Sequence, residues 1–238
     1  MKLDLLAFAA HPDDVELSCA GTLIKHSDAG YKTGVIDLTK GELGTRGNAE
    51  LRAQEAANAA KIMGLSVREN LDMPDGFFEV NEPNKMAVVR MIRKYRPEII
   101  IVNAIYDRHP DHGRASKIVS DAWFLSGLIK VITTVDGKEQ DAWRPKAVYH
   151  YIQDRMMKPD FIVDISEVMD KRSAAFHAFS SQFYNPSSTE PETAISSKQF
   201  LESLTGRALE MGRTIGTAFG EGFVAERTPG VSDIFKLL

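Results

Sequence analysis

Short runs of apolar residues alternate along the chain with longer segments in which apolar residues recur every three or four positions. The runs have the length of β-strands, and the longer segments have the periodicity of amphipathic helices. In the first part of the chain, the expected strands are residues 3–10, 32–39, 67–73 and 98–105. The expected helices of the same part are residues 15–29, 49–63, 84–95 and 115–125. Strands and helices therefore alternate, which is typical of parallel βα units.

The first strand and the ends of two helices support this interpretation. Residues 3–10 are almost all apolar, as in a central parallel strand that is covered on both faces. The first two helices are each followed by a glycine, Gly30 and Gly64, which suits the left-handed conformation that commonly ends a helix. Residues 41–48 carry three glycines and predict a loop.

The pattern is looser toward the C-terminus. The expected elements there are strands at residues 147–153 and 161–165 and helices at residues 166–183 and 198–211. Ser166 can cap the first of these helices, and residues 184–197, rich in Pro, Ser, Thr and Glu, predict a mobile loop. We expect a Rossmann-like three-layer α/β/α sandwich with a mostly parallel central sheet, formed by residues 1–238 as a single domain.

Composition and charge narrow the function classes. The formal net charge is -4, so the chain lacks the basic excess of a dedicated nucleic-acid binder. Asp4 interrupts the N-terminal apolar run, which favours a buried strand over a secretion signal, and no stretch approaches the roughly 20 apolar residues that cross a bilayer. The single cysteine, Cys19, cannot form an intrachain disulfide, which favours a reducing compartment. We therefore expect a cytoplasmic protein that binds neither nucleic acid nor membranes.

Two polar clusters follow two of the expected strands. The clusters are the segments HPDD at residues 11–14 and DRHPDH at residues 107–112. Ligands of open parallel sheets bind beyond the carboxyl ends of the strands. Because both strands can lie near the middle of the sheet, we expect the two clusters to meet there.

Imidazole and carboxylate groups in this combination suit a divalent metal ion such as Zn²⁺, with Fe²⁺ as the alternative. A catalytic zinc keeps three protein ligands and an open position for water. Two histidines and one aspartate satisfy that number and leave carboxylates that can take a proton from the water. A lone His-Pro-Asp is usually only a turn, but two copies at strand ends, each with a further acid or histidine, favour a metal centre.

These motifs resemble those of the LmbE-like (PIG-L) family of N-acetylglucosaminyl deacetylases. The resemblance rests on HPDD at residues 11–14 and HPDH at residues 109–112, and it extends across nearly the whole chain. Further segments that carry it are GELGTRG at 41–47, ELR at 50–52, NLDMPD at 70–75, SQF at 181–183 and GEGF at 220–223. The branch that the chain resembles most deacetylates N-acetylglucosaminyl-malate in bacillithiol biosynthesis.

The resemblance implies roles for individual residues. It implies three zinc ligands, which are His11, Asp14 and His112. Asp13 would be the general base that takes a proton from water at the metal. His109 would stabilise the oxyanion or protonate the leaving amine, and Asp111 would hold His109 in the right tautomer. Acetate and a free amine would be the products.

Arginines are the expected substrate contacts. Arg52 aligns with an arginine that the family uses near the substrate, where a guanidinium can pair with a carboxylate of a sugar-malate substrate; the alternative is an ion pair on the helix surface. Arg108 and Arg46 are further candidates. Some relatives have a tyrosine near the active site where this chain carries Phe200, which cannot donate a hydrogen bond. The section from about 145 to 238 is expected to complete the rim of the active site.

Several alternatives stay open from the sequence. Within the family, the substrate could instead be diacetylchitobiose, another N-acetylglucosamine derivative, or a thiol conjugate cleaved by an amidase. Outside it, non-catalytic nucleotide-binding modules share the predicted fold, but HPDD stands here in place of their G-x-G-x-x-G loop, and its acids would repel a pyrophosphate. We expect a small amino-sugar substrate, and the resemblance implies a homo-oligomer, with a hexamer as one form.

Overall fold

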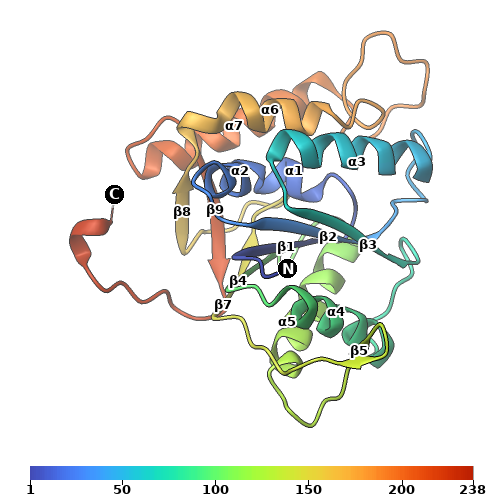
Figure 1. Ribbon diagram of the computed structural model, residues 1–238. Coiled ribbons are helices and arrows are strands. Elements are labelled where there is room, and N and C mark those ends of the chain that lie inside the picture. The colour runs from blue at the N-terminus through green and yellow to red at the C-terminus, as the bar shows by residue number, and fades with distance from the viewer. Residues whose placement is uncertain (238) are drawn as a thin grey trace.

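Seven strands form the central sheet of the computed structural model, which describes residues 1–237 (Figure 1). The strands are β1 (Leu5–Ala9), β2 (Thr33–Thr39), β3 (Val67–Met73), β4 (Ile99–Val102), β7 (Ala147–Tyr151), β8 (Phe161–Asp164) and β9 (Gly220–Ala225). They lie in the order β3-β2-β1-β4-β7-β9-β8. Only β9 is antiparallel to its neighbours, so the sheet is mostly parallel. A separate hairpin joins β5 (Thr134–Val135) and β6 (Lys138–Glu139).

Helices cover both faces of the sheet (Figure 1). One face carries α1 (Asp14–Ser18), α2 (Ala20–Asp28), α3 (Ala49–Met63), α6 (Met169–His177) and α7 (Lys198–Thr214). The other face carries α4 (Glu82–Tyr95) and α5 (Pro110–Ser126). Two 3-10 turns are η1 (Ser166–Val168) and η2 (Ile234–Lys236). The expected three-layer sandwich is confirmed. Across residues 1–237, no helix combines the length and the apolar character needed to cross a membrane.

Strand β1 is buried on both faces, which explains its uninterrupted apolar sequence. Leu6 and Phe8 belong to the core cluster that packs against α4 and α5. Leu5 and Ala7 point the other way, into the cluster that includes residues of α1 and α2. Successive strand residues alternate between faces, so a strand in the middle layer needs apolar residues at every position.

The order of the strands places an open crevice beside β1. From β1 the chain moves outward to β2 and β3 and then returns to the other side of β1 as β4, where Leu5 pairs with Ile99. The loop after β1 leads to helices on one face of the sheet, and the loop after β4 leads to α5 on the other face. A crevice forms between the two connections, as at the switch point of other open α/β sheets. The expectation that these two loops meet near the middle of the sheet is confirmed.

Two boundaries next to this crevice differ from the expected ones. The first expected helix is two helices, α1 and α2, which are separated at Cys19, where φ is -146°. The helix expected over residues 115–125 begins earlier, at Pro110. Pro110 suits the first helical turn because its missing N–H would have no partner there. His109 caps the helix, and its Nδ1 accepts a hydrogen bond from the backbone N–H of Asp111.

The last third of the chain differs most from the expected elements. The expected helix over residues 166–183 is η1 followed by α6, and α6 ends at His177. Ser166 does not cap α6, because its hydroxyl donates to Asp164 instead. Residues 184–197 contain no helix or strand, as expected.

Strand β9 lies outside every expected element because its glycines have low strand propensity. The glycines are needed where α7 lies against this strand. A Cβ on Gly212 would lie 2.6 Å from the backbone nitrogen of Phe219, and a Cβ on Gly220 would lie 3.0 Å from that of Gly212. Glycine is therefore needed at these positions because two backbones approach closely, although glycine has a low strand propensity.

Candidate metal centre

A cavity of about 250 Å³ opens where the loops after β1 and β4 meet. The expected site residues that line it are His11, Asp13, Asp14, Arg52, Arg108, His109 and His112. Asp111 is fully buried beside it. The last third of the chain contributes to the wall and rim through Gln153, Asp154, Phe200 and Arg207, among others.

Asp14 lies between the two histidines that were expected to share a metal with it. Its Oδ1 is 3.1 Å from Nε2 of His112, and its Oδ2 is 3.6 Å from Nδ1 of His11. All three side chains are at least nine-tenths buried. The structure therefore brings together one carboxylate and two imidazoles contributed by different loops of the sheet.

In both imidazoles, the ring nitrogen that does not face Asp14 contacts another carboxylate. Nε2 of His11 lies 2.9 Å from Oδ1 of Asp75 and 3.3 Å from Oδ2 of Asp111. Nδ1 of His112 lies 2.5 Å from Oδ2 of Asp107. A carboxylate behind each imidazole fixes the ring and its tautomer, which is how metal-binding histidines are usually supported. This leaves Nδ1 of His11 and Nε2 of His112 facing Asp14. The donor set fits a divalent ion that accepts nitrogen and oxygen ligands.

Other groupings lie within reach of the same cavity. Ring nitrogens of His11, His109 and His112 lie within 4.8 Å of one another, and so do ligand atoms of His11, Asp75 and Asp111. His109 therefore offers an additional nitrogen donor. In the second grouping both carboxylates already contact Nε2 of His11, so it is better described as support for that ring.

Two amides that were not expected from the sequence hold the Asp14 carboxylate. Nδ2 of Asn103 donates to Oδ2 of Asp14 and Nε2 of Gln153 donates to Oδ1, both at 3.0 Å. The amides also bind each other, because Nδ2 of Asn103 donates to Oε1 of Gln153 at 3.0 Å. Asn103 follows β4 and Gln153 follows β7 within two residues. The signal available in the sequence was a single polar residue near the carboxyl end of an expected strand, because Asn103 lies within residues 98–105 and Gln153 within residues 147–153.

The charges of the three central groups are strongly coupled. Burial alone would raise the pKa of Asp14, but His112 and His11 outweigh it and hold that pKa well below its usual range. Burial would lower the pKa of His112, yet the carboxylates of Asp14 and Asp107 raise it to about 9. Hydrogen bonds to Asp111, Asp14 and Asp75 likewise outweigh burial and raise the pKa of His11 well above its ordinary value. The acids thus favour positive charge on the rings, and a bound cation would compete with those protons.

Asp13 is held in an unusual conformation beside the cavity. Its φ of 119° lies in a region that residues other than glycine rarely adopt. Strained backbone of this kind is concentrated at functional sites. Burial raises the pKa of Asp13 to about 7, although Arg52, whose Nη1 lies 3.7 Å from Oδ2, opposes the shift. The Asp13 carboxyl can therefore both accept and release a proton near neutral pH.

The expected pairing of Asp111 with His109 is wrong. The Asp111 carboxylate accepts hydrogen bonds from the backbone of Gly76 at 2.8 Å and from Arg114 at 2.5 Å, and its third contact is His11. Burial lowers the pKa of His109, and His11 and His112 lower it further. Because Nδ1 of His109 accepts the Asp111 N–H, the neutral ring carries its proton on Nε2.

Arg52 is buried and not on the surface of α3. Its Nη1 donates to the carbonyl of Pro12 at 3.3 Å, and its Nη2 donates to Oε1 of Gln182. Glycine suits position 41, because its φ is 65° and a Cβ there would crowd the Arg52 guanidinium. The glycine-rich loop and the SQF segment thus enclose the arginine next to Asp13, and the alternative of an ion pair on the helix surface is ruled out.

The other two arginines have separate surroundings. Arg46 is buried and donates to the carbonyls of Pro191, Phe183 and Glu190, so it anchors the loop over residues 184–197. Nε of Arg108 lies 3.3 Å from the carboxylate of Asp154 at the cavity rim, where both side chains are largely exposed.

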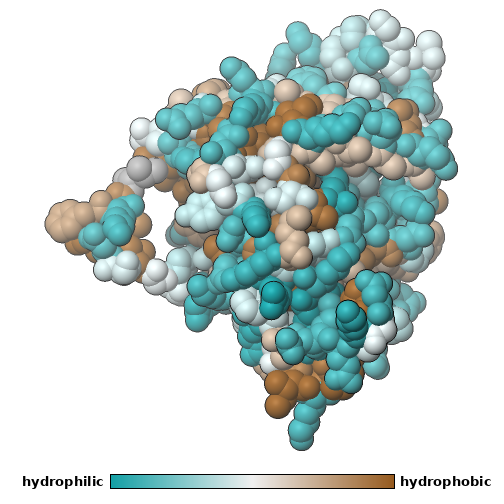
Figure 2. All heavy atoms as spheres, viewed as in Figure 1, coloured by the Kyte–Doolittle hydropathy of each residue, from teal (hydrophilic) through white to brown (hydrophobic). Residues whose placement is uncertain are grey.

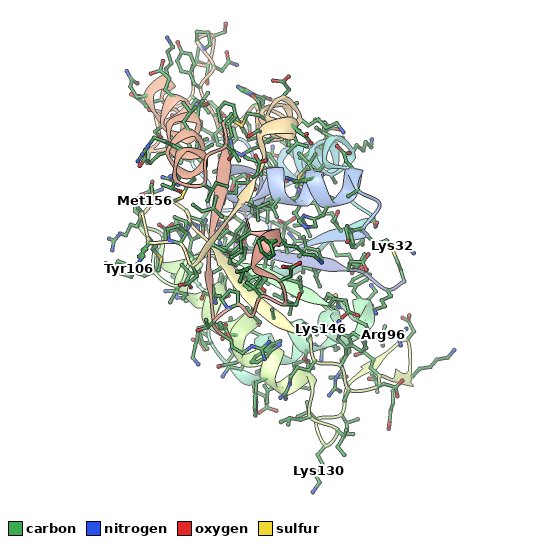
Figure 3. The ribbon with its side chains drawn as sticks, turned by 90° about the vertical axis from the view of Figure 1, so that its left-hand side faces the viewer. Lys32, Arg96, Tyr106, Lys130, Lys146 and Met156 are labelled. Atoms are coloured by element: carbon green, nitrogen blue, oxygen red, sulfur yellow. The ribbon has the colours of Figure 1, made fainter. Side chains whose placement is uncertain are left out.

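Apolar side chains stand beside this rim. Tyr106 and Met156 lie on the same side of the molecule (Figure 3), and both are exposed. Tyr106 lies two residues before Arg108, and Met156 lies two residues after Asp154. Phe200 of α7 lines the cavity itself.

Known proteins resemble this chain in sequence and in fold. A family model described as GlcNAc-PI de-N-acetylase (PIG-L) matches residues 6–123. Diacetylchitobiose deacetylase from Thermococcus kodakarensis is 30% identical over 189 residues, which is 75% of this chain and 70% of that protein. The crystal structure of the conserved protein TT1542 from Thermus thermophilus superposes with a TM-score of 0.86 at 33% identity over 98% of each chain.

The malate-conjugate branch is not singled out by these comparisons. A probable N-acetyl-α-D-glucosaminyl L-malate deacetylase 2 from Bacillus anthracis is 22% identical over 186 residues, 73% of this chain and 78% of that protein. That identity is lower than the identity to the diacetylchitobiose enzyme over a similar length. The expected assignment to the bacillithiol branch is therefore not specifically supported.

Proposed function

The chain belongs to the GlcNAc-PI de-N-acetylase (PIG-L) family and is a metal-dependent amidohydrolase, and from this premise we propose that it deacetylates an N-acetylglucosamine disaccharide with Zn²⁺ held by His11, Asp14 and His112. The observation that carries the proposal is the Asp14 carboxylate between two imidazoles, each supported by a carboxylate behind it. Fe²⁺ is the alternative ion, because the same ligands suit it. A non-catalytic nucleotide-binding module is excluded by the family.

A divalent ion at this centre would lower the pKa of water from 15.7 to about 7 and polarise an amide carbonyl. Asp13 is placed to accept the proton that water loses, because its carboxyl lines the cavity and its pKa is about 7. Arg52 keeps the Asp13 side chain beside the metal ligands through its contacts with Pro12 and Gln182. General base catalysis by a positioned carboxylate typically contributes about a hundredfold or more.

His109 is the second proton-handling group of the proposal. Its Nε2–H can donate to the negative charge that develops on the amide oxygen, and its lowered pKa keeps it neutral and able to do so. The proton held by Asp13 can then pass to the departing nitrogen, which leaves the Asp13 carboxylate ready for the next water. Asp111 acts through the other ring, by supporting His11. The products are acetate and a free amino sugar.

The neutral disaccharide is preferred over the malate conjugate for two reasons. The relative with 30% identity deacetylates diacetylchitobiose, as its name states. Arg52, which the sequence suggested for a substrate carboxylate, is instead committed to Pro12, Gln182 and Asp13. Arg108, which pairs with Asp154 at the rim, is more exposed than Arg207 in the cavity wall, and it supports N-acetylglucosaminyl-malate as the second candidate.

The test is acetate release from N,N'-diacetylchitobiose and from N-acetylglucosaminyl-malate, measured with and without a chelator. We expect chelation to abolish turnover and added Zn²⁺ to restore it. Asp13→Asn keeps the size of the side chain and tolerates the positive φ, so it should retain stoichiometric metal and lose activity about a hundredfold or more. Asp72→Asn is the matched control, since Asp72 also has a positive φ but is exposed outside the cavity.

Each part of the proposal can fail separately. Full activity of Asp13→Asn would contradict the role of Asp13 as the general base. Full turnover by metal-free protein would contradict the catalytic role of the metal. Faster release from the malate conjugate than from the disaccharide would overturn the substrate preference alone.

Assembly and location are also part of the proposal. We propose a homo-oligomer, for which a hexamer is one form, and a reducing compartment such as the cytoplasm. The second point rests on the single cysteine, Cys19, which is buried.

A further inference from the structure

A short loop after β7 supports two of the three proposed metal ligands. Nε2 of Gln153 donates to Oδ1 of Asp14 at 3.0 Å. Two residues later, the backbone N–H of Arg155 donates to Oδ1 of Asp107 at 2.8 Å, and Oδ2 of Asp107 contacts Nδ1 of His112. We call the segment from Gln153 to Arg155 the β7 loop. The positions of Asp14 and His112 therefore both depend on where this loop lies.

Two contacts at the surface join the β7 loop to the loop after β4. The guanidinium carbon of Arg155 lies 4.2 Å from the centre of the Tyr106 ring. Nε of Arg108 lies 3.3 Å from Oδ2 of Asp154. All four side chains are exposed, and water and salt screen the charges of such groups. These two contacts therefore hold the β7 loop only weakly.

A further contact reaches the main chain of the β7 loop from α7. Nη1 of Arg207 donates to the carbonyl of Gln153, and Nη2 donates to the carbonyl of Asp154 at 3.2 Å. A planar guanidinium that binds two consecutive carbonyls fixes both their position and their direction. Asn103 and Ala104 orient the amide of Gln153 by donating to its Oε1, whereas Arg207 holds the backbone that carries this amide. Arg207 is half buried in the cavity wall.

Helix α7 gives Arg207 a fixed base. Leu204, Ala208 and Met211 are buried on the side of the helix that packs on the protein. The outward side is mostly polar, and Figure 2 shows hydrophilic residues over much of the surface of this helical layer. Phe200 precedes Arg207 by about two helical turns, so both side chains can face the cavity that they line. The guanidinium therefore reaches the β7 loop from a helix that the core holds in place.

We propose that Arg207 is a positioning residue of the metal centre, which holds the β7 loop where Gln153 reaches Asp14 and the N–H of Arg155 reaches Asp107. This inference rests on the proposed metal centre. Without the guanidinium, the loop backbone would lose its contact with α7, and the support of the ligands would become less precise. Loss of such support typically costs about 10–100-fold in metal affinity. A residue that only fastened α7 to the protein would change stability and leave metal affinity unchanged.

The test measures the zinc dissociation constant of the full-length chain by competition with a fluorescent chelator. Arg207→Ala should raise this constant at least about tenfold, because two ligands lose part of their support. Arg144→Ala is the matched control. Nη2 of Arg144 also donates to a main-chain carbonyl, that of Phe124, but Arg144 lies outside the cavity. We expect the control variant to bind zinc like the native chain.

Chemical rescue gives a measurement that a general loss of stability would not reproduce. Arg207→Ala retains Cβ, and ethylguanidinium supplies the side-chain atoms that are missing beyond it. The ion can reach the vacated place, because Arg207 lines the open cavity. Millimolar ethylguanidinium should lower the zinc dissociation constant of the variant toward the native value. Ethylammonium has the same charge but no planar pair of donors, so it should leave the constant unchanged.

Several results would overturn the positioning role. One is a native dissociation constant in Arg207→Ala, and another is equal rescue by the two cations. Arg207→Lys provides a second variant if the alanine variant does not fold. Lysine keeps the charge but not the planar fork, so zinc affinity should again fall, and native affinity would contradict the proposal. A native chain that binds no zinc would instead reject the proposed metal centre itself, and no arm of the experiment depends on enzyme activity.

Discussion

Two clusters of buried carboxylates lie close together near the carboxyl ends of β1 and β2, and their charges are balanced in different ways. The first, which we call the arginine cluster, consists of Glu16, Asp37 and Arg68. Arg68 binds Asp37 through two hydrogen bonds of 2.7 and 3.0 Å and Glu16 through one of 2.5 Å. The second is the metal centre around Asp14, where the balancing groups are imidazoles and neutral amides.

The difference in the balancing groups indicates a structural role for the arginine cluster and a metal-binding role for the cluster around Asp14. The arginine cluster contains its own permanent cation, and the carboxylates raise the pKa of Arg68 further against the effect of burial. The cations that contact Asp14 are titratable imidazoles, and the metal centre faces a cavity. Buried acids that are balanced by a guanidinium need no ligand, whereas buried acids beside imidazoles and open space leave a place for an ion. Changes in each cluster should therefore alter different properties.

Arg68→Met should have the largest effect on stability. It leaves Glu16 and Asp37 buried without a cation, and breaking a buried ion pair in this way costs about 3–5 kcal/mol. Denaturant unfolding measures the loss. Arg213→Met is the matched control, because Arg213 pairs with Glu210 on the surface and should change the free energy of unfolding by about 0.5 kcal/mol or less. Equal stability of the two variants would contradict the comparison.

Zinc should stabilise the metal centre by a smaller amount. At a free concentration of about 100 times the dissociation constant, a ligand that binds only the folded state adds about 2.7 kcal/mol to the free energy of unfolding. Thermal and denaturant unfolding of chelated and zinc-loaded protein measure this gain. Asp14→Ala should abolish it, whereas Arg68→Met should keep most of it. A gain that survives in Asp14→Ala would place the ion elsewhere.

Gln153→Met should weaken metal binding without unfolding the chain. The substitution keeps the length of the side chain but removes the amide N–H that holds Asp14, and loss of such support typically costs about 10–100-fold in metal affinity. Competition with a fluorescent chelator gives the dissociation constant. Gln140→Met is the control, because that amide donates to the backbone of Arg90 away from the centre. An unchanged dissociation constant would show that Gln153 only fills space.

Glu98→Gln should have the smallest effect, since it concerns a carboxylate on the surface. Hydrogen bonds from Lys146 and Lys2 lower the pKa of Glu98 from 4.5 to about 2. A lowered pKa in the folded state stabilises it above pH 4.5, and the stabilisation is lost as the pH falls toward 2. The difference in unfolding free energy between wild type and variant should therefore be small at about pH 6 and vanish near pH 2. A difference that grows on acidification would contradict this sign.

The residues that sequence analysis identified are those that stand together in the chain. HPDD and HPDH each combine several ligating groups directly after an apolar strand, so topology alone brings them together. Asp75, Asn103 and Gln153 are single polar residues in separate segments, and only the folded chain shows that they converge on His11 and Asp14.

The misassigned role of Asp111 has a local cause. In a loop, Asp111 could face His109, but the helix begins at Pro110 and successive helical side chains diverge by about 100°. The Asp111 carboxylate therefore points to His11, Gly76 and Arg114. The position of a helix start, which sequence patterns define poorly, decides which histidine an acid supports.

The position of β9 in the sheet affects how the protein is made. In this sheet β8 pairs only with β9, and β9 also pairs with β7, although more than fifty residues separate β8 from β9 in the chain. While the ribosome is still adding those residues, β8 has no partner and one edge of β7 is unpaired. Exposed edges of this kind template aggregation. The nascent chain should therefore be most vulnerable late in synthesis, until residues 220–225 emerge and join the two strands.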